Sequence, residues 1–336
     1  MPSPTMPDPT MKAAIVTRYG PPEVVEIQDV APPRAKPGQV VIRQHATSLN
    51  SGDARIRAAR MPPGFGLILR LVFGLTGPRQ PILGIVVAGE VAEVGPGVTN
   101  VAVGDRVLAT TGFAMRAQAE LVAVKAGRLV PLPANLTMPE AAALPFGALT
   151  ALYYLRDRAK LAIGERILIL GASGAVGAAA VQQARHTGAQ VTGVASAANA
   201  DLVRALGADA TIDYHAQDVR ALGQRYDVIL DCTGQASAAN CRAILVPGGR
   251  LCLVVASLAQ QVLAGWHSRR TGVQVIAGVG AESPADLAYL AGLAAQGPLR
   301  PHIGATFPLA RIAQAHALVD TGHKRGNVVI TFDAAG

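Results

Sequence analysis

Three closely spaced glycines, Gly171, Gly174 and Gly177, are the residues whose types and spacing point most directly to chemistry. They follow an unbroken apolar run at 167–170 and precede an alanine-rich stretch at 175–186 that predicts a helix. A buried strand, a glycine turn and a helix are the setting in which proteins bind a dinucleotide. Glycine lets the backbone approach the pyrophosphate, and the first helical turn offers free N–H groups. The alternative is an ordinary strand–helix turn.

The predicted phosphate-binding residues are those of the whole turn: Gly171, Ala172, Ser173, Gly174, Ala175, Val176 and Gly177. Ala172 stands where the usual pattern has its first glycine. A site specific for NAD carries a carboxylate at the end of the second strand, about 20 residues further on, to hold the ribose 2′-hydroxyl. Ser196 occupies that place, so no acid repels a 2′-phosphate and a hydroxyl can donate to it. We therefore expect NADPH (NADP+) as the cofactor.

The composition limits the class of protein. The chain has 336 residues, of which 50% are hydrophobic and 15% charged, so about two domains with large cores are expected. The net charge is +8, but the basic residues are dispersed and aromatic residues make up only 4%, so we expect no nucleic-acid partner. No apolar run reaches the roughly 18 residues of a membrane span. The Pro-rich first ten residues lack the apolar core of a secretory signal, and the odd count of cysteines favours reduced thiols in a cytoplasmic protein.

The element pattern predicts an α/β protein with two kinds of architecture. Short strands separated by Gly and Pro, with one helix at 54–60, indicate a small barrel; the strands are expected at 12–18, 24–30 and 40–45, and a long one within 81–94. Beyond residue 133, strands alternate with helices, which indicates a doubly wound parallel sheet. Its strands are expected at 167–170, 191–195, 211–213, 228–231, 250–255 and 273–279, and further helices at 139–144, 150–161, 284–296 and 309–321. A last strand is expected at 327–332.

A series of short motifs runs in order along almost the whole chain. They read AGEVAEVGPGV at 88–98, VGDRV at 103–107, EAAALPFGALTALYYL at 140–155, GASGAVG at 171–177, LGADATIDY at 206–214, PGGR at 247–250 and TGHKRGNVVI at 321–330. Together they resemble the medium-chain dehydrogenase/reductase superfamily, in its zinc-free, quinone oxidoreductase-like (zeta-crystallin-type) branch.

The resemblance implies a GroES-like β-barrel domain and a Rossmann domain with a doubly wound parallel sheet. We expect a flexible tail at 1–10, the GroES-like substrate domain at 11–135, the dinucleotide-binding domain at 136–280, and a return to the first domain at 281–336. It also implies an NADPH-dependent oxidoreductase that reduces quinones, or carbon–carbon double bonds conjugated to a carbonyl, by hydride transfer. The expected substrate is a small hydrophobic carbonyl compound or quinone, bound between the domains.

Zinc-dependent relatives carry a Cys in the first domain and a Gly-His-Glu segment. Here those places fall near Asn50 and at 84–86, which reads Gly-Ile-Val, and no Cys occurs before Cys232. No pair of His residues has ligand spacing. We therefore expect no zinc and no metal.

The same resemblance assigns further site residues. Asn50 matches the asparagine of the family's cleft and can orient substrate or nicotinamide; the alternative is a loop cap that bonds its own backbone. Thr150 matches the nicotinamide-facing helix, and its alternative is a hydroxyl that bonds a preceding helical carbonyl. Tyr214 matches a tyrosine that lines the adenosine phosphate, and Lys324 and Arg325 match a segment that reaches the cofactor. Their alternatives are surface positions. The sequence offers no clear general acid, so water is expected to deliver the proton.

Two features leave alternatives open. The apolar segment 65–78 predicts a lid or wall for a hydrophobic substrate, a patch near lipid quinones, or a buried helix under the barrel. The run 273–279 predicts an edge strand of the parallel sheet, and pairing of this edge between two copies, as in related enzymes, gives a homodimer. Two other functions are also possible readings of the sequence. One is a non-catalytic NADPH-binding assembly or regulatory protein. The other is an alcohol dehydrogenase, but the missing metal ligands count against it.

Overall fold

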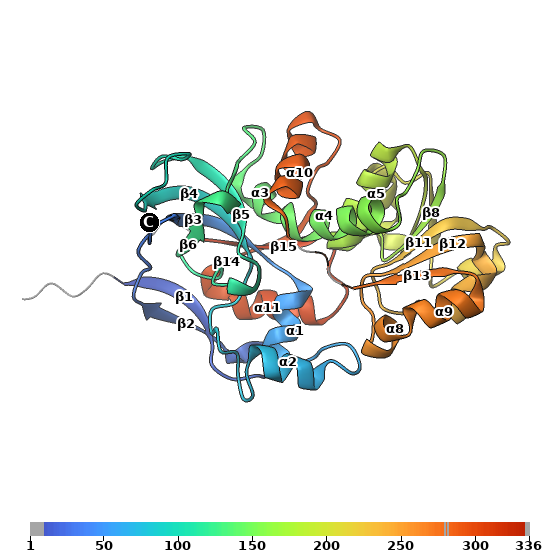
Figure 1. Ribbon diagram of the computed structural model, residues 1–336, viewed down its shortest axis with the longest axis horizontal. Coiled ribbons are helices and arrows are strands. Elements are labelled where there is room, and N and C mark those ends of the chain that lie inside the picture. Colours follow the sequence, from blue (N-terminus) through green and yellow to red (C-terminus); the bar gives the residue numbers. More distant parts are fainter. Residues whose placement is uncertain (1–9, 279, 281, 333–336) are drawn as a thin grey trace, which may run out of the picture.

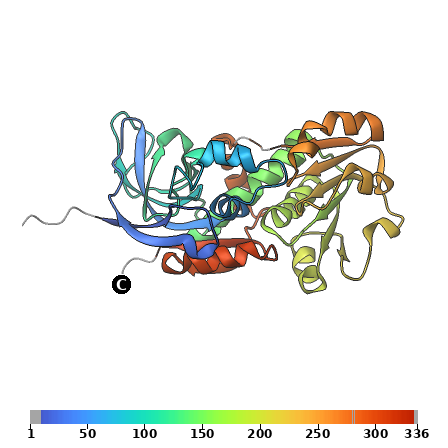
Figure 2. The same cartoon turned by 90° about the horizontal axis from the view of Figure 1, so that it is seen from below.

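The computed structural model describes residues 10–278, 280 and 282–332. Most of the predicted tail at 1–10, and the end of the run predicted at 273–279, therefore lie outside the described residues. Figure 1 shows two units side by side, one built from the first part of the chain together with its end, the other from the middle part. Figure 2 shows the same two units from below.

The first unit is built on a seven-stranded sheet with the order β14-β15-β3-β4-β5-β7, in which β6 also pairs with β3. Its strands are β3 (Gln39–Leu49), β4 (Val86–Val94), β5 (Arg106–Thr110), β6 (Leu121–Lys125), β7 (Val130–Pro131), β14 (Ile303–Pro308) and β15 (Asn327–Thr331). A separate hairpin joins β1 (Met11–Val16) to β2 (Val25–Val30). The GroES-like arrangement agrees with the prediction. The prediction did not include β14. None of its residues is fully buried, so its sequence gives only a weak indication of a strand.

The second unit is a six-stranded parallel sheet with the order β10-β9-β8-β11-β12-β13. Its strands are β8 (Arg166–Leu170), β9 (Gln190–Ala195), β10 (Ala210–Asp213), β11 (Tyr226–Asp231), β12 (Leu245–Leu253) and β13 (Gln274–Ala277). This is the doubly wound Rossmann order, and it confirms the predicted fold class. It also confirms that β13 is an edge strand.

The apolar run of β8 is buried on both faces, as predicted. Ile167 and Ile169 contribute to the core shared with the helix that follows the turn, whereas Leu168 contributes to the core on the opposite face. All three side chains are fully buried. Since alternate residues of a strand point to opposite faces, helices on both sides of the sheet require this continuous run.

Helices cover these sheets and connect the two units. They are α1 (Ser51–Ala58), α2 (Gly66–Phe73), α3 (Met138–Ala143), α4 (Pro145–Leu152), α5 (Ala175–Thr187), α6 (Ala200–Ala205), α7 (Ala238–Cys241), α8 (Leu258–Val262), α9 (Ala264–Thr271), α10 (Pro284–Gln296) and α11 (Ile312–Asp320). Among the described residues, no helix is both long and apolar enough to cross a bilayer.

Two helical predictions differ from the structure. The helix predicted at 150–161 begins earlier, at Pro145, and continues as a π-helix over Tyr153–Arg158. In the segment 65–78, α2 buries only Leu69, so the alternative of a buried helix is wrong. An apolar helix on the surface cannot be distinguished from a core helix by its composition, because both carry the same residues.

Candidate dinucleotide site

The glycine turn between β8 and α5 has the geometry that the prediction requires. Gly171 has φ +77°, a value that side chains rarely allow. A Cβ on Gly177 would lie 2.2 Å from the carbonyl oxygen of Gly171, so the helix packs against the strand without space for a side chain. A Cβ on Gly174 would meet only that same oxygen, at 3.4 Å. The turn is therefore closed on the protein side at Gly177 and open at Gly174.

The N-terminus of α5 is available for an anion. Its N-cap is Gly174, and no side chain caps the helix. The first N–H groups of a helix have no partner within the helix, and a phosphate satisfies them while interacting favourably with the helix dipole. The turn thus fits a pyrophosphate.

The end of the chain lies against this turn. Gly174 forms a parallel β-bridge with Gly326, and the Gly326 N–H donates to the carbonyl oxygen of Ser173 at 2.7 Å. The predicted residues Lys324 and Arg325 directly precede this contact. Lys324 Nζ donates to the Gly326 carbonyl oxygen at 2.7 Å, and burial lowers the pKa of this ammonium to about 8. The structure therefore places both basic residues beside the glycine turn.

The strand after Gly326 links the turn to Asn50. In the antiparallel pairing of β15 with β3, Val328 lies opposite Leu49, so Asn50 comes at the end of β3 that faces the turn. The path from Gly174 through Gly326 to Asn50 crosses two strand spacings, which corresponds to about 10 Å. Two predicted site residues from different units are thereby brought near one another.

The amide of Asn50 has two distinct roles in the structure. Its Oδ1 accepts the N–H groups of Gly52 and Asp53 at 2.8 and 3.1 Å, which caps α1 and fixes the orientation of the amide. Its Nδ2 is buried and has no hydrogen-bond partner among the described residues. The capping alternative is thus correct for the oxygen, while the nitrogen is left as an unsatisfied donor. A buried donor of this kind is costly unless a ligand accepts from it.

A buried carboxyl group stands directly behind Asn50. Asp53 completes the capping box, because its Oδ2 accepts the Asn50 N–H at 3.0 Å. Burial raises the pKa of Asp53 to about 7, and nearby Glu282 adds to this effect, while N–H groups of Asn50 and Gly84 oppose it. Glu282 reaches this place from the segment after β13, 4.0 Å from Nη1 of Arg128.

Thr150 lies in the middle of α4 with its hydroxyl already in use. Its Oγ1 donates to the Phe146 carbonyl oxygen at 2.8 Å, as the structural alternative expects. The lone pairs of this oxygen can still accept a hydrogen bond. Of the two following tyrosines, Tyr154 is a packing residue, since its buried hydroxyl bonds the carbonyl oxygens of Leu253 and Gly278 at 2.7 and 2.6 Å.

Ser196 and Tyr214 lie side by side at the predicted adenosine end. In the parallel pairing of β9 and β10, Ala195 lies opposite Asp213, and the two predicted residues come next on each strand. Ser196 Oγ accepts from Asn199 Nδ2 at 3.1 Å, which leaves the hydroxyl hydrogen free to donate outward. Tyr214 is 51% exposed and presents a ring to solvent.

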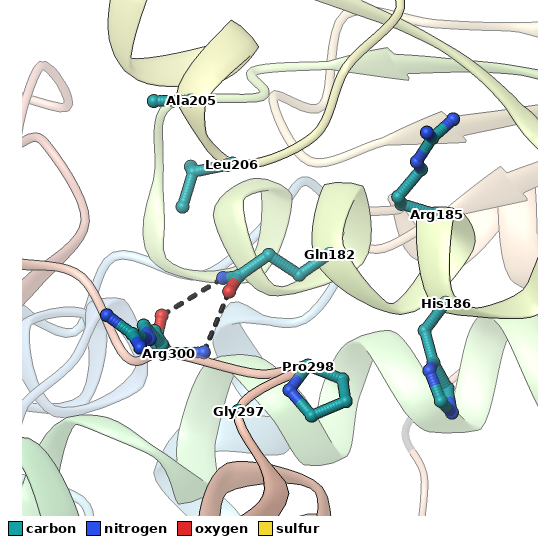
Figure 3. A pocket seen from close by; sticks show the side chains of 8 residues that line it. All are labelled: Gln182, Arg185, His186, Ala205, Leu206, Gly297, Pro298 and Arg300. Atoms are coloured by element: carbon teal, nitrogen blue, oxygen red, sulfur yellow. Dashed lines mark hydrogen bonds between the residues drawn. The ribbon is translucent and has the colours of Figure 1, made fainter.

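A further cavity lies elsewhere. It has a volume of about 420 Å³ and is lined by residues of the second half of α5, of the end of α6 and of the segment 297–300 (Figure 3). In it, Gln182 exchanges two hydrogen bonds with the backbone of Arg300, 2.8 and 3.0 Å long. Arg185 lies 11 residues beyond Gly174 along the helix, or about 16 Å. This cavity is therefore separate from the glycine turn.

Metal ligands and reactive thiols are not concentrated in this region. Within residues 10–278, 280 and 282–332, no three or more His, Cys, Asp and Glu side chains come together in a way that could hold a metal ion. Cys241 and Cys252 are buried and Cys232 is half-buried, and all three are free. Burial raises the pKa of each thiol.

Comparison with known proteins identifies the family. A family model described as alcohol dehydrogenase GroES-like domain matches residues 36–134, and one described as zinc-binding dehydrogenase matches residues 206–330. A quinone oxidoreductase of Pseudomonas aeruginosa is 34% identical over 330 residues, which are 93% of this chain and 97% of that protein. The chain belongs to the medium-chain dehydrogenase/reductase superfamily. It falls among the quinone oxidoreductase-like and alkenal/one oxidoreductase-like members, as the motifs predicted.

Further relatives support this placement within the superfamily. An NADPH-dependent alkenal/one oxidoreductase of Arabidopsis thaliana is 29% identical over 332 residues, covering 95% of this chain and 79% of that protein. The solved structure of the quinone oxidoreductase from Coxiella burnetii has a TM-score of 0.86 and 30% identity, and covers 97% of this chain and 100% of that chain. The chain also matches the pikromycin polyketide synthase component PikAII of Streptomyces venezuelae, at 36% identity over 236 residues, but spans only 6% of that much longer protein.

Three polar residues at this site are missing from the sequence-based prediction. Asp53 has a signal in retrospect, because a residue three positions after an N-cap closes a capping box. Asn199 and Glu282 have none, since their positions depend on how the loops after β9 and β13 fold. The structure thus adds a hydrogen-bond partner for Ser196 and a second carboxylate near Asn50.

Proposed function

We propose that this protein is an NADPH-dependent, metal-free oxidoreductase that reduces quinones, or carbon–carbon double bonds conjugated to a carbonyl. The observation that carries the proposal is the placement of an unsatisfied amide donor, Asn50 Nδ2, near an open glycine turn at an uncapped helix N-terminus. The relatives named above, at about 30% identity, support the same reaction class.

The glycine turn would hold the pyrophosphate, and the first turn of α5 would supply its N–H groups. Ser196 and Asn199 would receive the 2′-phosphate, and Tyr214 would cover the adenosine. The absence of a carboxylate from the end of β9 supports NADPH over NADH. Lys324 and Arg325 add positive charge beside the turn. NADPH supplies the hydride when it is bound.

The protein's contribution to the reaction is to position the substrate and stabilise charge. Addition of a hydride to an enone or quinone places negative charge on the carbonyl oxygen, and a preorganised donor at that oxygen lowers the barrier. Asn50 Nδ2 is such a donor, held in place because Oδ1 is fixed by the cap of α1. Thr150 would accept a hydrogen bond from the nicotinamide or substrate, and water would deliver the proton that completes the reduction.

The donor set supports chemistry without a metal. The places where zinc-dependent relatives carry ligands hold Asn50 and the segment Gly84-Ile85-Val86, which are not ligands that zinc favours. Asn50 Oδ1 is in addition occupied by two N–H groups. We therefore assign no step to a metal.

Stopped-flow mixing tests the proposal. The protein and NADPH are mixed with a panel of quinones, enals and 2-enoyl thioesters, and NADPH absorbance is followed. The expected result is rapid oxidation with at least one class and little with NADH. Tight binding of NADPH without oxidation by any of them would instead support a non-catalytic NADPH-binding protein.

A further inference from the structure

A large part of the exposed apolar surface of the described chain lies on one side of the molecule. Helix α2 leaves Leu67, Leu71 and Val72 exposed by 70%, 57% and 51%, and Leu75, just beyond its end, by 64%. Phe113 extends this surface, since its ring lies 6.4 Å from that of Phe73 and is 83% exposed. A helix that exposes so many apolar side chains needs a partner to cover it.

A second apolar ridge lies beside it on the other unit. At α8 and α9, Val262, Leu263 and Trp266 are exposed by 72%, 43% and 51%. The two ridges meet where the Leu258 N–H donates to the Pro63 carbonyl oxygen at 3.0 Å. Figures 1 and 2 both place α2 and the α8–α9 pair on the same side of the molecule. We call these two ridges together the α2/α9 face.

The two stretches of chain that carry α2 and the α8–α9 pair are basic. The sequence contains no Asp or Glu from 54 to 89, nor from 232 to 281, although Arg residues occur in both stretches. Arg70 lies in the last turn of α2, and Arg269 and Arg270 lie in the last turn of α9. The Arg270 guanidinium lies 5.1 Å from the centre of the Trp266 ring. An amphipathic tryptophan beside arginines, next to aliphatic side chains, is the combination that binds the interface of an anionic bilayer.

A second copy of the chain fits this face less well. A two-fold contact would bring Arg70, Arg269 and Arg270 of both copies into one interface, and these two stretches of the chain offer no carboxylate to pair with them. Pairing α2 of one copy with α9 of another would also bring positive charge to positive charge. Since like charges at an interface oppose association, the charge pattern selects an anionic partner.

We propose that the α2/α9 face docks the protein on the surface of an anionic lipid bilayer, with the apolar ridges in the headgroup region and the arginines at lipid phosphates. This inference goes beyond the proposed reductase activity and does not depend on it. A protein held there would be next to apolar molecules dissolved in the bilayer.

The single tryptophan of the chain makes the test direct, because Trp266 lies on the proposed face. The full chain is mixed with vesicles of phosphatidylglycerol and phosphatidylcholine, and in parallel with vesicles of phosphatidylcholine alone. We expect co-flotation with the anionic vesicles, a blue shift of the tryptophan emission, and at least about ten-fold weaker binding to the neutral vesicles. Binding should weaken as salt is raised.

Two substitutions separate this face from a general effect of charge. Leu71→Glu should lower binding to anionic vesicles about ten-fold or more, because it removes an apolar contact and adds a negative charge. The matched control is Ile163→Glu, which changes a side chain that is 84% exposed and precedes the amino end of β8, whereas α8 follows the carboxyl end of the parallel strand β12. It should leave binding within about two-fold.

Three outcomes would overturn the proposal. The first is the absence of binding to anionic vesicles by the folded wild-type protein, checked by circular dichroism. The second is an equal loss in Leu71→Glu and Ile163→Glu. The third is a Leu71→Glu protein that binds vesicles normally but changes its oligomeric state in sedimentation velocity, which would assign the face to contact between copies of the chain.

Discussion

Gly174 and Gly326 are paired by a parallel β-bridge, although they are more than 150 positions apart in the sequence. This contact fixes the start of β15 against the glycine turn, and the register of β15 on β3 then fixes Asn50. The glycine turn in one unit and an amide donor in the other are thereby held at a constant separation. Hydride transfer requires such a constraint, because the reacting atoms must be held in a narrow range of geometry.

Substitution of Gly174 should impair cofactor binding, whereas substitution of Gly177 should impair folding stability. Gly174→Val should fold normally, since a Cβ there meets only one atom at 3.4 Å, but it should weaken NADPH binding at least about 100-fold by filling the space of the pyrophosphate. Gly177→Ala should instead destabilise the fold by about 1–3 kcal/mol, because its Cβ would lie 2.2 Å from the Gly171 oxygen. Calorimetric titration with NADPH and thermal melts measure the two effects.

A matched control for these variants is Gly292→Val. This glycine lies in α10, and a Cβ there has no neighbour within 4 Å. It should leave NADPH affinity unchanged and should not lower stability, because valine is no worse a helix former than glycine. Retained NADPH affinity in Gly174→Val would contradict the placement of the pyrophosphate.

The sequence predicted the parallel sheet and the glycine turn because they depend on local patterns. The strand at Ile167 is apolar without alternation, and the glycines have fixed spacing, so both are visible in a window of about twelve residues. The unsatisfied nitrogen of Asn50 and the partner of Ser196 could not be predicted. They depend on which side-chain atoms the loops leave unpaired, and this is decided by tertiary packing. The exposure of α2 was unpredictable for the same reason.

Ser196→Asp should invert the cofactor preference. A carboxylate at the end of β9 would repel the 2′-phosphate of NADPH and accept from the ribose hydroxyl of NADH. Two negative charges near the surface repel by about 2 kcal/mol, which corresponds to a loss of about 30-fold in NADPH affinity. Fluorescence titration with both nucleotides measures the two affinities. Ser196→Ala removes only a hydroxyl, so it should lose less NADPH affinity than Ser196→Asp. Equal losses for NADPH and NADH in Ser196→Asp would contradict this placement.

Asn50→Asp should separate capping from catalysis. Aspartate caps a helix as well as asparagine does, but this position is buried beside the carboxyl of Asp53, so Asn50→Asp should melt below the wild type and the uncharged Asn50→Ser should stay within a few degrees of it. The substitution removes the Nδ2 donor, and kcat/KM for an accepted quinone or enone should fall about 100-fold. Asn50→Ser keeps a cap without adding charge, and should show a similar loss. Normal kcat/KM in both variants would show that the unpaired amide does not act on the substrate.

The buried carboxyl of Asp53 should make stability fall as the pH rises. Burial raises its pKa in the folded protein to about 7, from an ordinary value of 3.8, so between these values the folded chain holds a proton that the unfolded chain has released. Folding therefore becomes less favourable through this pH range, by on the order of 4 kcal/mol in total. Asp53→Asn removes this dependence, while its side-chain oxygen can still accept the Asn50 N–H.

The measurement is the difference in unfolding free energy between Asp53→Asn and the wild type, from urea melts at pH 4.5, 6 and 8. As the pH rises, the unfolding free energy of Asp53→Asn should increase relative to that of the wild type. Burial lowers the pKa of His316 to about 3, so this residue destabilises the folded protein at pH values below its ordinary pKa of 6.5. The effect is the same in the variant and the wild type and cancels in the difference. Asp218→Asn is the control: hydrogen bonds from Arg220 lower the pKa of that exposed carboxyl, so it is ionised in the folded and the unfolded protein at these pH values, and its difference should stay nearly constant. A difference for Asp53→Asn that stays constant with pH would mean that this carboxyl titrates near its ordinary value in the folded protein.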